Sequence, residues 1–123
     1  MVIDIHRLSV YSAHMTKEMR EPTFLVLATL ATGKKHGYAI IQGVEHLSDG
    51  HVELKAGTLY TMLDRLVFEN IIEVAGEEVV NGRLRRYYQL TKNGAGELSA
   101  ESQRRVSVSK VALRRLRLSG GIA

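Results

Sequence analysis

The side chains best suited to chemistry in this sequence are hydrogen-bond donors, and they gather in two short stretches. The first, residues 55–65, carries basic and hydroxyl groups between its apolar residues: Lys55, Thr58, Tyr60, Thr61 and Arg65. The second, residues 83–86, carries Arg83, Arg85 and Arg86. Ammonium, guanidinium and hydroxyl donors bind phosphate oxygens and base edges. Both stretches are therefore candidates for contact with a nucleic acid.

The first stretch is expected to lie on an amphipathic helix that begins near Gly57 or Thr58. Its apolar residues recur at helical spacing: Leu59, Met62, Leu63, Leu66 and Val67. A helix enters the major groove of DNA only if one face packs on its domain while the other presents donors. The pattern supplies both faces, and Tyr60 lies on the polar one. On spacing alone, a polar face that is simply solvated is the commoner interpretation.

The second stretch lies where the pattern changes from a helical period to alternation. Residues 71–74 and 83–90 are expected to form the two strands of a hairpin, with residues 79–82 between them. The connecting segment ends in Asn81-Gly82, a dipeptide typical of a tight turn. The hairpin would form the wing of a winged-helix domain.

The wing arginines are expected to divide between the two faces of their strand. Side chains alternate along a strand, so Arg83 and Arg85 share one face, whereas Arg86 points to the other. A glycine-containing tip flanked by arginine suits the DNA backbone or the minor groove. The alternative is a charged edge strand that guards against aggregation. Glu77 and Glu78 lie in the same hairpin and oppose the arginine cluster.

Two helices are expected before these stretches. The segment from Phe24 to Leu30 is apolar nearly all round, as a buried helix requires, and Pro22 suits its first turn. Residues 37–47 repeat apolar side chains at helical spacing, and we expect Tyr38 to pack in the core. Thr91 is expected to cap a long final helix.

The final helix carries an apolar stripe that a single small domain cannot easily cover. Its members are Leu98, Val106, Leu113 and Leu116. Pairing with a second copy would bury the stripe, and packing back onto its own domain is the alternative. The helix is also basic, but its apolar face lacks the aromatic residues that favour binding to a membrane surface.

These elements define a fold that is mainly α with a β-hairpin wing, an α+β arrangement. We expect a winged helix-turn-helix domain over residues 15–92 and a C-terminal dimerisation helix over residues 93–119. Residues 1–14 show no clear periodicity and are expected to form an arm.

Composition limits the class of protein. A chain of 123 residues is expected to be one domain, and its lack of cysteine excludes a disulfide scaffold and a thiolate zinc site. No apolar run is long enough to span a membrane and no secretory signal is evident, so a cytoplasmic location is expected. The net charge of +4 comes from residues 97–118, which hold six basic and two acidic residues. Local clusters, rather than global charge, must therefore indicate the partner.

Neither a metal site nor an enzyme active site is expected. Glu45, His46, Asp49 and His51 could offer ligands, but the two histidines lack the i, i+4 spacing of a helical metal site, and a polar loop is the simpler interpretation. No Gly-x-Ser-x-Gly elbow positions a nucleophile, and the glycines lack the spacing of a phosphate-binding loop.

Three groups of residues are more specific than the periodicity. They are His36-Gly37-Tyr38, Gly57-Thr58-Leu59-Tyr60 and Tyr87-Tyr88-Gln89-Leu90-Thr91-Lys92-Asn93-Gly94. In this order the sequence resembles the PadR family of bacterial transcription regulators. The resemblance runs from about Met15 to Leu98 with matching spacing, whereas residues 1–14 have no counterpart in the family core.

The resemblance implies a winged-helix DNA-binding domain, a homodimer joined mainly by terminal helices, and a repressor that a small-molecule effector releases. The single terminal helix is similar to that of the compact class of the family. We therefore expect a sequence-specific transcriptional regulator that binds a palindromic operator in double-stranded DNA and needs no cofactor. The alternative is a winged-helix interaction module whose wing arginines bind an acidic protein, and salt-dependent binding to duplex DNA separates the two.

Overall fold

The computed structural model describes residues 18–120, so the expected arm of residues 1–14 lies outside the described residues. In chain order the elements are α2 (Glu21–Leu30), β1 (Lys35–His36), α3 (Gly37–Leu47), α4 (Ala56–Phe68), β2 (Ile72–Val80), β3 (Arg83–Leu90) and α5 (Lys92–Leu118). Three helices, a hairpin and a long last helix confirm the predicted winged helix-turn-helix of α+β class.

The core lies between α2, α3, α4 and the base of the sheet. Helix α2 begins at Glu21, and Pro22 lies in its first turn, where its missing N–H is not needed. Most of this helix is buried. The buried hydroxyl of Thr29 donates to the Leu25 carbonyl oxygen at 2.8 Å, which satisfies the polar group within its own helix. The largest fully buried side chains come from all four parts of the core: Leu27, Val26, Ile40, Val44, Leu59, Leu63, Leu66 and Ile72.

Helix α3 has the predicted bounds but not the predicted orientation at its start. Ile40 and Val44 are fully buried and define the inner face. Tyr38 was expected to pack in the core, and this prediction is wrong, because the side chain is 65% exposed. Tyr38 precedes Ile40 by two residues, which places it about 200° around the helix from that buried side chain.

The wing is longer than its sequence pattern indicates. Strand β2 continues from Ile72 to Val80, so residues 79 and 80 belong to the strand and not to the connection. Asn81 and Gly82 alone make the turn, with φ of 52° and 76°, the left-handed values that a tight hairpin turn requires. Alternation is lost in the middle of β2 because a register irregularity falls between Val74 and Gly76.

Strand β1 was not predicted from the sequence. Its two residues, Lys35 and His36, pair with Tyr88 and Tyr87 of β3, so the antiparallel sheet has the order β1-β3-β2. The strand is too short for an alternating pattern to reveal it. Through this pairing the start of α3 is tied to the wing.

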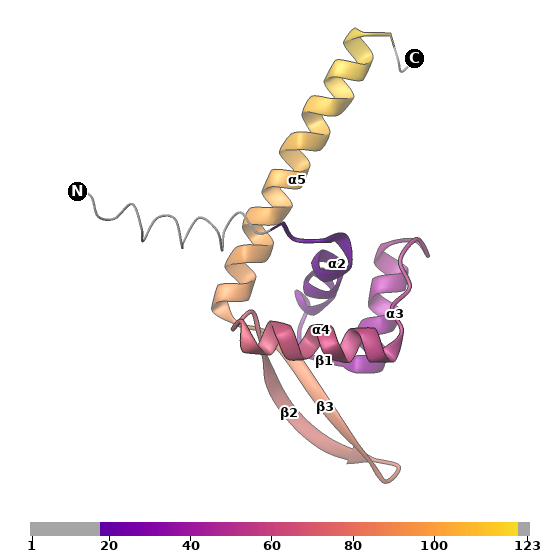
Figure 1. Cartoon of the computed structure of the whole chain (residues 1–123), viewed down its shortest axis with the longest axis vertical. Helices are drawn as coiled ribbons and strands as arrows, with labels where there is room; N and C mark the ends of the chain where they lie inside the picture. Colours follow the sequence, from indigo (N-terminus) through magenta and orange to yellow (C-terminus); the bar gives the residue numbers. More distant parts are fainter. Residues whose placement is uncertain (1–17, 121–123) are drawn as a thin grey trace, which may run out of the picture.

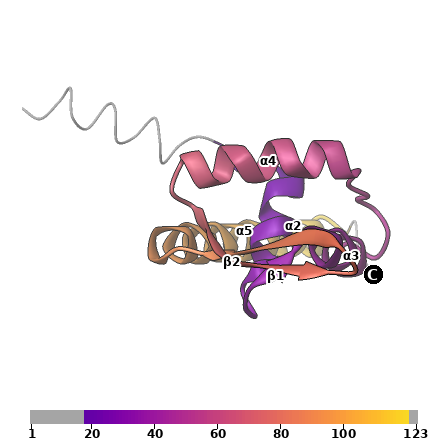
Figure 2. The same cartoon turned by 90° about the horizontal axis from the view of Figure 1, so that it is seen from below.

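The wing and α5 extend from opposite ends of the domain (Figure 1). Seen from below, α4 lies along one side of the molecule with the hairpin beside it (Figure 2). As predicted, Thr91 caps α5, with its hydroxyl oxygen accepting from the N–H of Gly94 at 2.9 Å. The molecule therefore presents α4 and the wing together, away from most of α5.

Candidate nucleic-acid interface

Helix α4 has the two faces that the sequence predicts. Leu59, Leu63 and Leu66 are buried against the core, and Met62 is partly buried. The predicted donors on this helix and at its N-cap are all exposed: Lys55, Thr58, Tyr60, Thr61 and Arg65. Val67 was expected on the inner face but is exposed near the end of the helix.

Arg65 differs from the other predicted donors because it is held by its own chain. Its guanidinium donates to the Thr23 hydroxyl at 3.2 Å and pairs with the Glu69 carboxylate at 3.3 Å. The bond to Thr23 ties α4 to the start of α2, whereas Glu69 is the residue that follows α4, so the second pair lies at the end of the same helix. Its side chain is nevertheless 41% exposed. Arg65 therefore combines a structural contact with a donor that still faces solvent.

A shallow hollow of about 520 Å³ lies beside Arg65, between α4 and the start of α2. Thr58 and Thr61 line it from α4, and Arg20 lines it from the residue that precedes α2. Arg20 thus joins the predicted donors at this surface. No spacing pattern in the sequence indicates Arg20, because this residue reaches the surface only through the packing of α2 on α4.

The three wing arginines are not equivalent. Arg86 pairs with the Glu77 carboxylate at 2.7 Å, and this hydrogen bond raises the pKa of Arg86. Glu78, which is opposite Arg85 in the ladder, instead accepts a hydrogen bond from the Tyr87 hydroxyl. Within the described part of the chain, Arg83 and Arg85 have no carboxylate partner. The glutamates of the hairpin therefore neutralise Arg86, and they leave Arg83 and Arg85, the two arginines predicted to contact DNA, without an ion pair.

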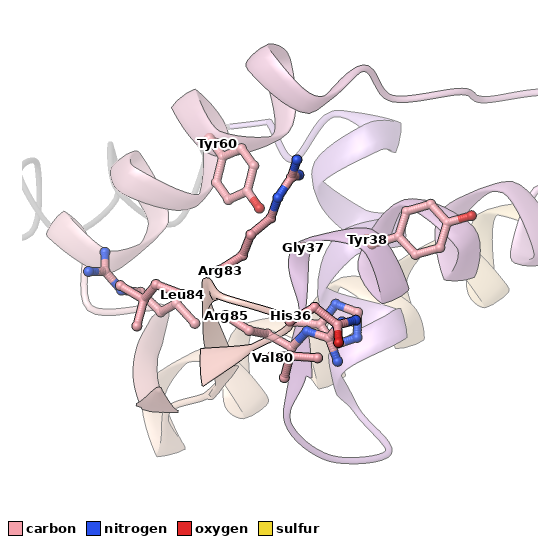
Figure 3. Close-up of a pocket in the computed structure, with 10 residues that line it drawn as sticks. His36, Gly37, Tyr38, Tyr60, Val80, Arg83, Leu84 and Arg85 are labelled. Atoms are coloured by element: carbon pink, nitrogen blue, oxygen red, sulfur yellow. The ribbon is translucent and has the colours of Figure 1, made fainter. Parts of the chain in front are cut away.

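A second hollow, of about 480 Å³, separates α4 from the wing (Figure 3). Tyr60 borders it from α4, and Arg83 and Arg85 border it from β3. In Figure 3 the Arg83 side chain extends across the hollow toward the ring of Tyr60, whereas Tyr38 points away. Arg86 also lines this hollow, but its guanidinium is paired with Glu77. Two guanidinium groups without a carboxylate partner in the described residues and one phenol thus meet at a single concave surface. This combination of donors suits phosphate oxygens.

The position of Tyr60 depends on a glycine in α3. A Cβ atom added to Gly37 would collide with the hydroxyl and the ring of Tyr60. Two of the sequence groups, His36-Gly37-Tyr38 and Gly57-Thr58-Leu59-Tyr60, therefore meet in space at this contact. Tyr60 is also 47% exposed, so the ring packs on α3 and still faces the hollow.

His36 joins the wing to α3. Its Nδ1 atom accepts from the Ala39 N–H at 3.4 Å, which caps α3, and its ring meets Tyr87 edge-on with centroids 5.6 Å apart. Burial lowers the pKa of His36, and electrostatic repulsion from Arg85 lowers it further. Attraction to Glu78 raises the pKa but does not outweigh these two effects. The neutral imidazole is the form that can accept the capping hydrogen bond.

The apolar stripe of α5 is covered only at its base. Leu98 packs partly against the core of its own domain, although it was expected to lie in a dimer interface. The upper members remain uncovered in this chain: Val106, Leu113 and Leu116 are 52%, 49% and 44% exposed. The structure thus separates the stripe into a domain-facing part and a free part.

Two kinds of feature are absent from residues 18–120. No group of three or more histidine, cysteine, aspartate or glutamate side chains in this range is arranged to hold a metal ion. No helix in the same range is both long and apolar enough to cross a membrane.

The fold and this surface define a winged-helix protein with a donor-lined face. A model of the PadR-like family of transcriptional regulators matches residues 26–100, and the chain belongs to this family. The family consists of transcriptional regulators and not of enzymes, which confirms that expectation. An uncharacterized protein of Lysinibacillus sphaericus is 29% identical over 75 residues, which are 61% of this chain and 69% of that protein.

Solved structures support the same assignment. A PadR family transcription regulator from Clostridium difficile R20291 is 26% identical, with a TM-score of 0.66 over 79% of this chain and 99% of that one. A PadR family regulator from Eggerthella lenta is also 26% identical, with a TM-score of 0.58 over 87% and 94% of the two chains. Bacillus subtilis PadR, solved with operator DNA, shares the fold at 23% identity and a TM-score of 0.59, over 66% of this chain and 47% of that one.

Proposed function

We propose that this regulator binds DNA as a sequence-specific homodimer and acts as a ligand-responsive repressor. Helix α4 enters the major groove, where its exposed donors reach base edges, and the wing lies against the adjacent backbone. Two copies of α4 related by a twofold axis require a palindromic operator. Such a regulator works in the cytoplasm, where bacterial DNA is accessible.

The hollow between α4 and the wing is the observation that carries this proposal. Arg83 and Arg85 face it without a carboxylate partner in the described residues, and Tyr60 faces them from α4. Cations left unpaired at a concave surface favour a polyanionic partner, since neutralised phosphates release their counterions. The operator complex of Bacillus subtilis PadR shows that a protein of this fold binds DNA, which supports the same assignment here.

The uncovered part of the α5 stripe supports the dimer. Val106, Leu113 and Leu116 lie beyond the cover of their own domain, on a helix that extends away from it (Figure 1). A second copy of α5 would bury these side chains in a helix pair. An effector would act by favouring a dimer geometry in which the two α4 helices no longer match the spacing of the operator.

Single arginine variants test the DNA interface against a matched control. We expect Arg83→Ala and Arg85→Ala each to weaken binding to duplex DNA on all sequences and to lower the salt slope by about one. Arg86→Ala removes a cation from the same strand, but one that Glu77 already neutralises, so its effect on the slope is expected to be smaller. Anisotropy titrations at several salt concentrations measure both quantities. Equal slopes in all three variants and the unaltered protein would contradict the assigned interface.

The same titrations address the alternative function, an interaction module for an acidic protein. The free guanidinium groups of the wing also suit carboxylates. A folded protein that binds no duplex DNA at low salt would favour this alternative.

A further inference from the structure

The direction of α5 relative to the DNA-binding domain is set by contacts at two heights on the helix. The lower contact is at its start, where Thr91 donates to the Asn70 and Ile71 carbonyl oxygens at 2.8 and 3.0 Å. Gly94 approaches the Ile71 carbonyl so closely that a Cβ atom would not fit. These contacts, together with Leu98, which packs against the core just above them, fix the first turns of the helix. Contacts confined to the first turns, however, leave the direction of a helix of 27 residues loosely fixed.

Arg105 supplies the upper contact. Its guanidinium donates to the main-chain oxygen of Met19 at 2.8 Å and lies over the ring of Phe24, 4.2 Å from the centroid. The same group bonds the Glu101 carboxylate, one turn below on α5, at 2.7 Å. One side chain therefore joins α5 to the start of α2 by a charged hydrogen bond and a cation–π contact.

Glu101 keeps Arg105 oriented toward α2. The hydrogen bond from Arg104 lowers the pKa of Glu101, and the hydrogen bond from Arg105 lowers it further. Together they outweigh burial, which raises the pKa. The carboxylate therefore stays ionised near neutral pH and remains an acceptor for both arginines. Because Glu101 is one turn below Arg105 on the same helix face, it limits the rotamers that the guanidinium can adopt.

Above Arg105 the helix has few contacts with its own domain. Residues 106–118 rise by about 20 Å at about 1.5 Å per residue. In this upper part only Val111 is even half-buried. A small change of angle at Arg105 is therefore magnified at the end of α5, where the free apolar side chains lie.

We propose that Arg105 is a positioning residue, which fixes the angle between α5 and the domain and so sets the distance between the two α4 helices of a dimer. This inference rests on the proposed function, because that distance matters only if two copies bind one operator. Arg105 contacts no DNA in this scheme. It determines which half-site spacing the dimer accepts, since both α4 helices must meet their grooves together.

Arg104 provides a matched control. It bonds the same Glu101 carboxylate at 2.7 Å, but in the described part of the chain it donates no hydrogen bond to α2 or to the residues before it. Arg104→Ala and Arg105→Ala therefore remove the same charge from the same helix turn. The first loses only an electrostatic attraction to Glu18 before α2, whereas the second loses the hydrogen bond to Met19 and the cation–π contact with Phe24. Phe24→Leu removes the aromatic face while keeping an apolar side chain, and it provides an independent second variant.

Spin-label distances test the angle without requiring a dimer or DNA. The chain has no cysteine, so Glu45→Cys on α3 and Arg114→Cys on α5 provide the two sites for spin labels. The labelled protein is diluted with unlabelled protein, so that only distances within one chain are measured. We expect a narrow distance distribution for the unaltered background and for Arg104→Ala, and a broad or shifted one for Arg105→Ala and Phe24→Leu. An unchanged narrow distribution in both of the last two variants would overturn the proposal.

Binding to a series of palindromes with different half-site spacing tests the consequence. The unaltered protein is expected to bind one spacing more tightly than the others. In Arg105→Ala the ratio of affinities between the preferred and the other spacings is expected to fall about tenfold, while binding to a single half-site is unchanged. Arg104→Ala should keep the preference. Equal preference in all three proteins would overturn the role of Arg105 in spacing. Broadened spin-label distances in a protein that neither dimerises nor binds DNA would instead overturn the proposed function.

Discussion

At the scale of single residues, the chemistry of the surface depends on which cations are already paired. The sequence shows three wing arginines and two glutamates, and alternation assigns Arg83 and Arg85 to one face. Only the structure shows that Glu77 forms its ion pair with Arg86, because the hairpin register determines which glutamate lies opposite which arginine. The exposure of Tyr38 is not predictable for a different reason: a helical period identifies an apolar stripe, but a tyrosine at its margin suits either side.

His36 gives a pH-dependent prediction at this scale. Its pKa is lowered in the folded protein, so the unfolded chain binds the proton first as the pH falls below about 6.5. Stability is therefore expected to be fully present above this pH and to decrease as the pH falls toward the pKa of the folded state.

The control for this prediction is His36→Asn, which keeps a capping acceptor at the start of α3 but does not titrate. Urea unfolding at about pH 7.5 and about pH 5.5 measures the difference for both proteins. We expect a smaller loss of stability in the variant. An equal loss in the two proteins would show that other groups cause the pH dependence.

At the scale of elements, long amphipathic segments were predictable and short or irregular strands were not. Helix α3 has the predicted bounds, and α4 begins one residue before the predicted start, since each buries a stripe of helical period. Strand β2 was predicted too short because Gly76 and two glutamates interrupt its alternation, although cross-strand pairing continues to Val80. Strand β1 owes its existence to pairing with β3, which no local pattern encodes.

The contact between α3 and α4 gives a prediction about coupled elements. Gly37→Ala places a methyl group where the Tyr60 hydroxyl and ring lie, and we expect a loss of about 1–3 kcal/mol of stability. Combining it with Tyr60→Ala should restore part of this loss, giving a coupling energy of about 0.5–3 kcal/mol. Thermal or urea unfolding of the two single variants and the double variant completes the cycle. Strictly additive losses would contradict the assigned contact.

At the scale of the whole molecule, the arrangement separates the proposed DNA-binding surface from the proposed dimer surface. Helix α4 and the wing form one surface, and the upper part of α5 extends away from it (Figures 1 and 2). The sequence predicted both surfaces from the two amphipathic patterns. It did not show that Leu98 packs against the domain core, nor that Arg105 joins α5 to α2, because both contacts depend on how distant elements pack.

The dimer surface can be tested with two substitutions on different faces of α5. Leu113→Glu would bury a charge in the proposed helix pair and is expected to weaken dimerisation by at least about 2 kcal/mol, or about thirtyfold. Ser107→Glu adds the same charge about 120° around the helix from Leu113 and about 180° from Leu116, and it should leave the dimer intact. Sedimentation equilibrium distinguishes the two. A dimer that survives Leu113→Glu unchanged would show that this stripe is not the interface.

Recognition of specific DNA by this PadR family member can be tested in a single binding experiment. The purified protein is titrated with the DNA upstream of its own coding sequence and with a shuffled duplex of equal composition, at about 50 mM and about 200 mM salt. We predict tighter binding to the upstream fragment and a steep loss of affinity for both duplexes as the salt concentration rises. A folded dimer that binds neither duplex at the lower salt concentration would contradict the claim.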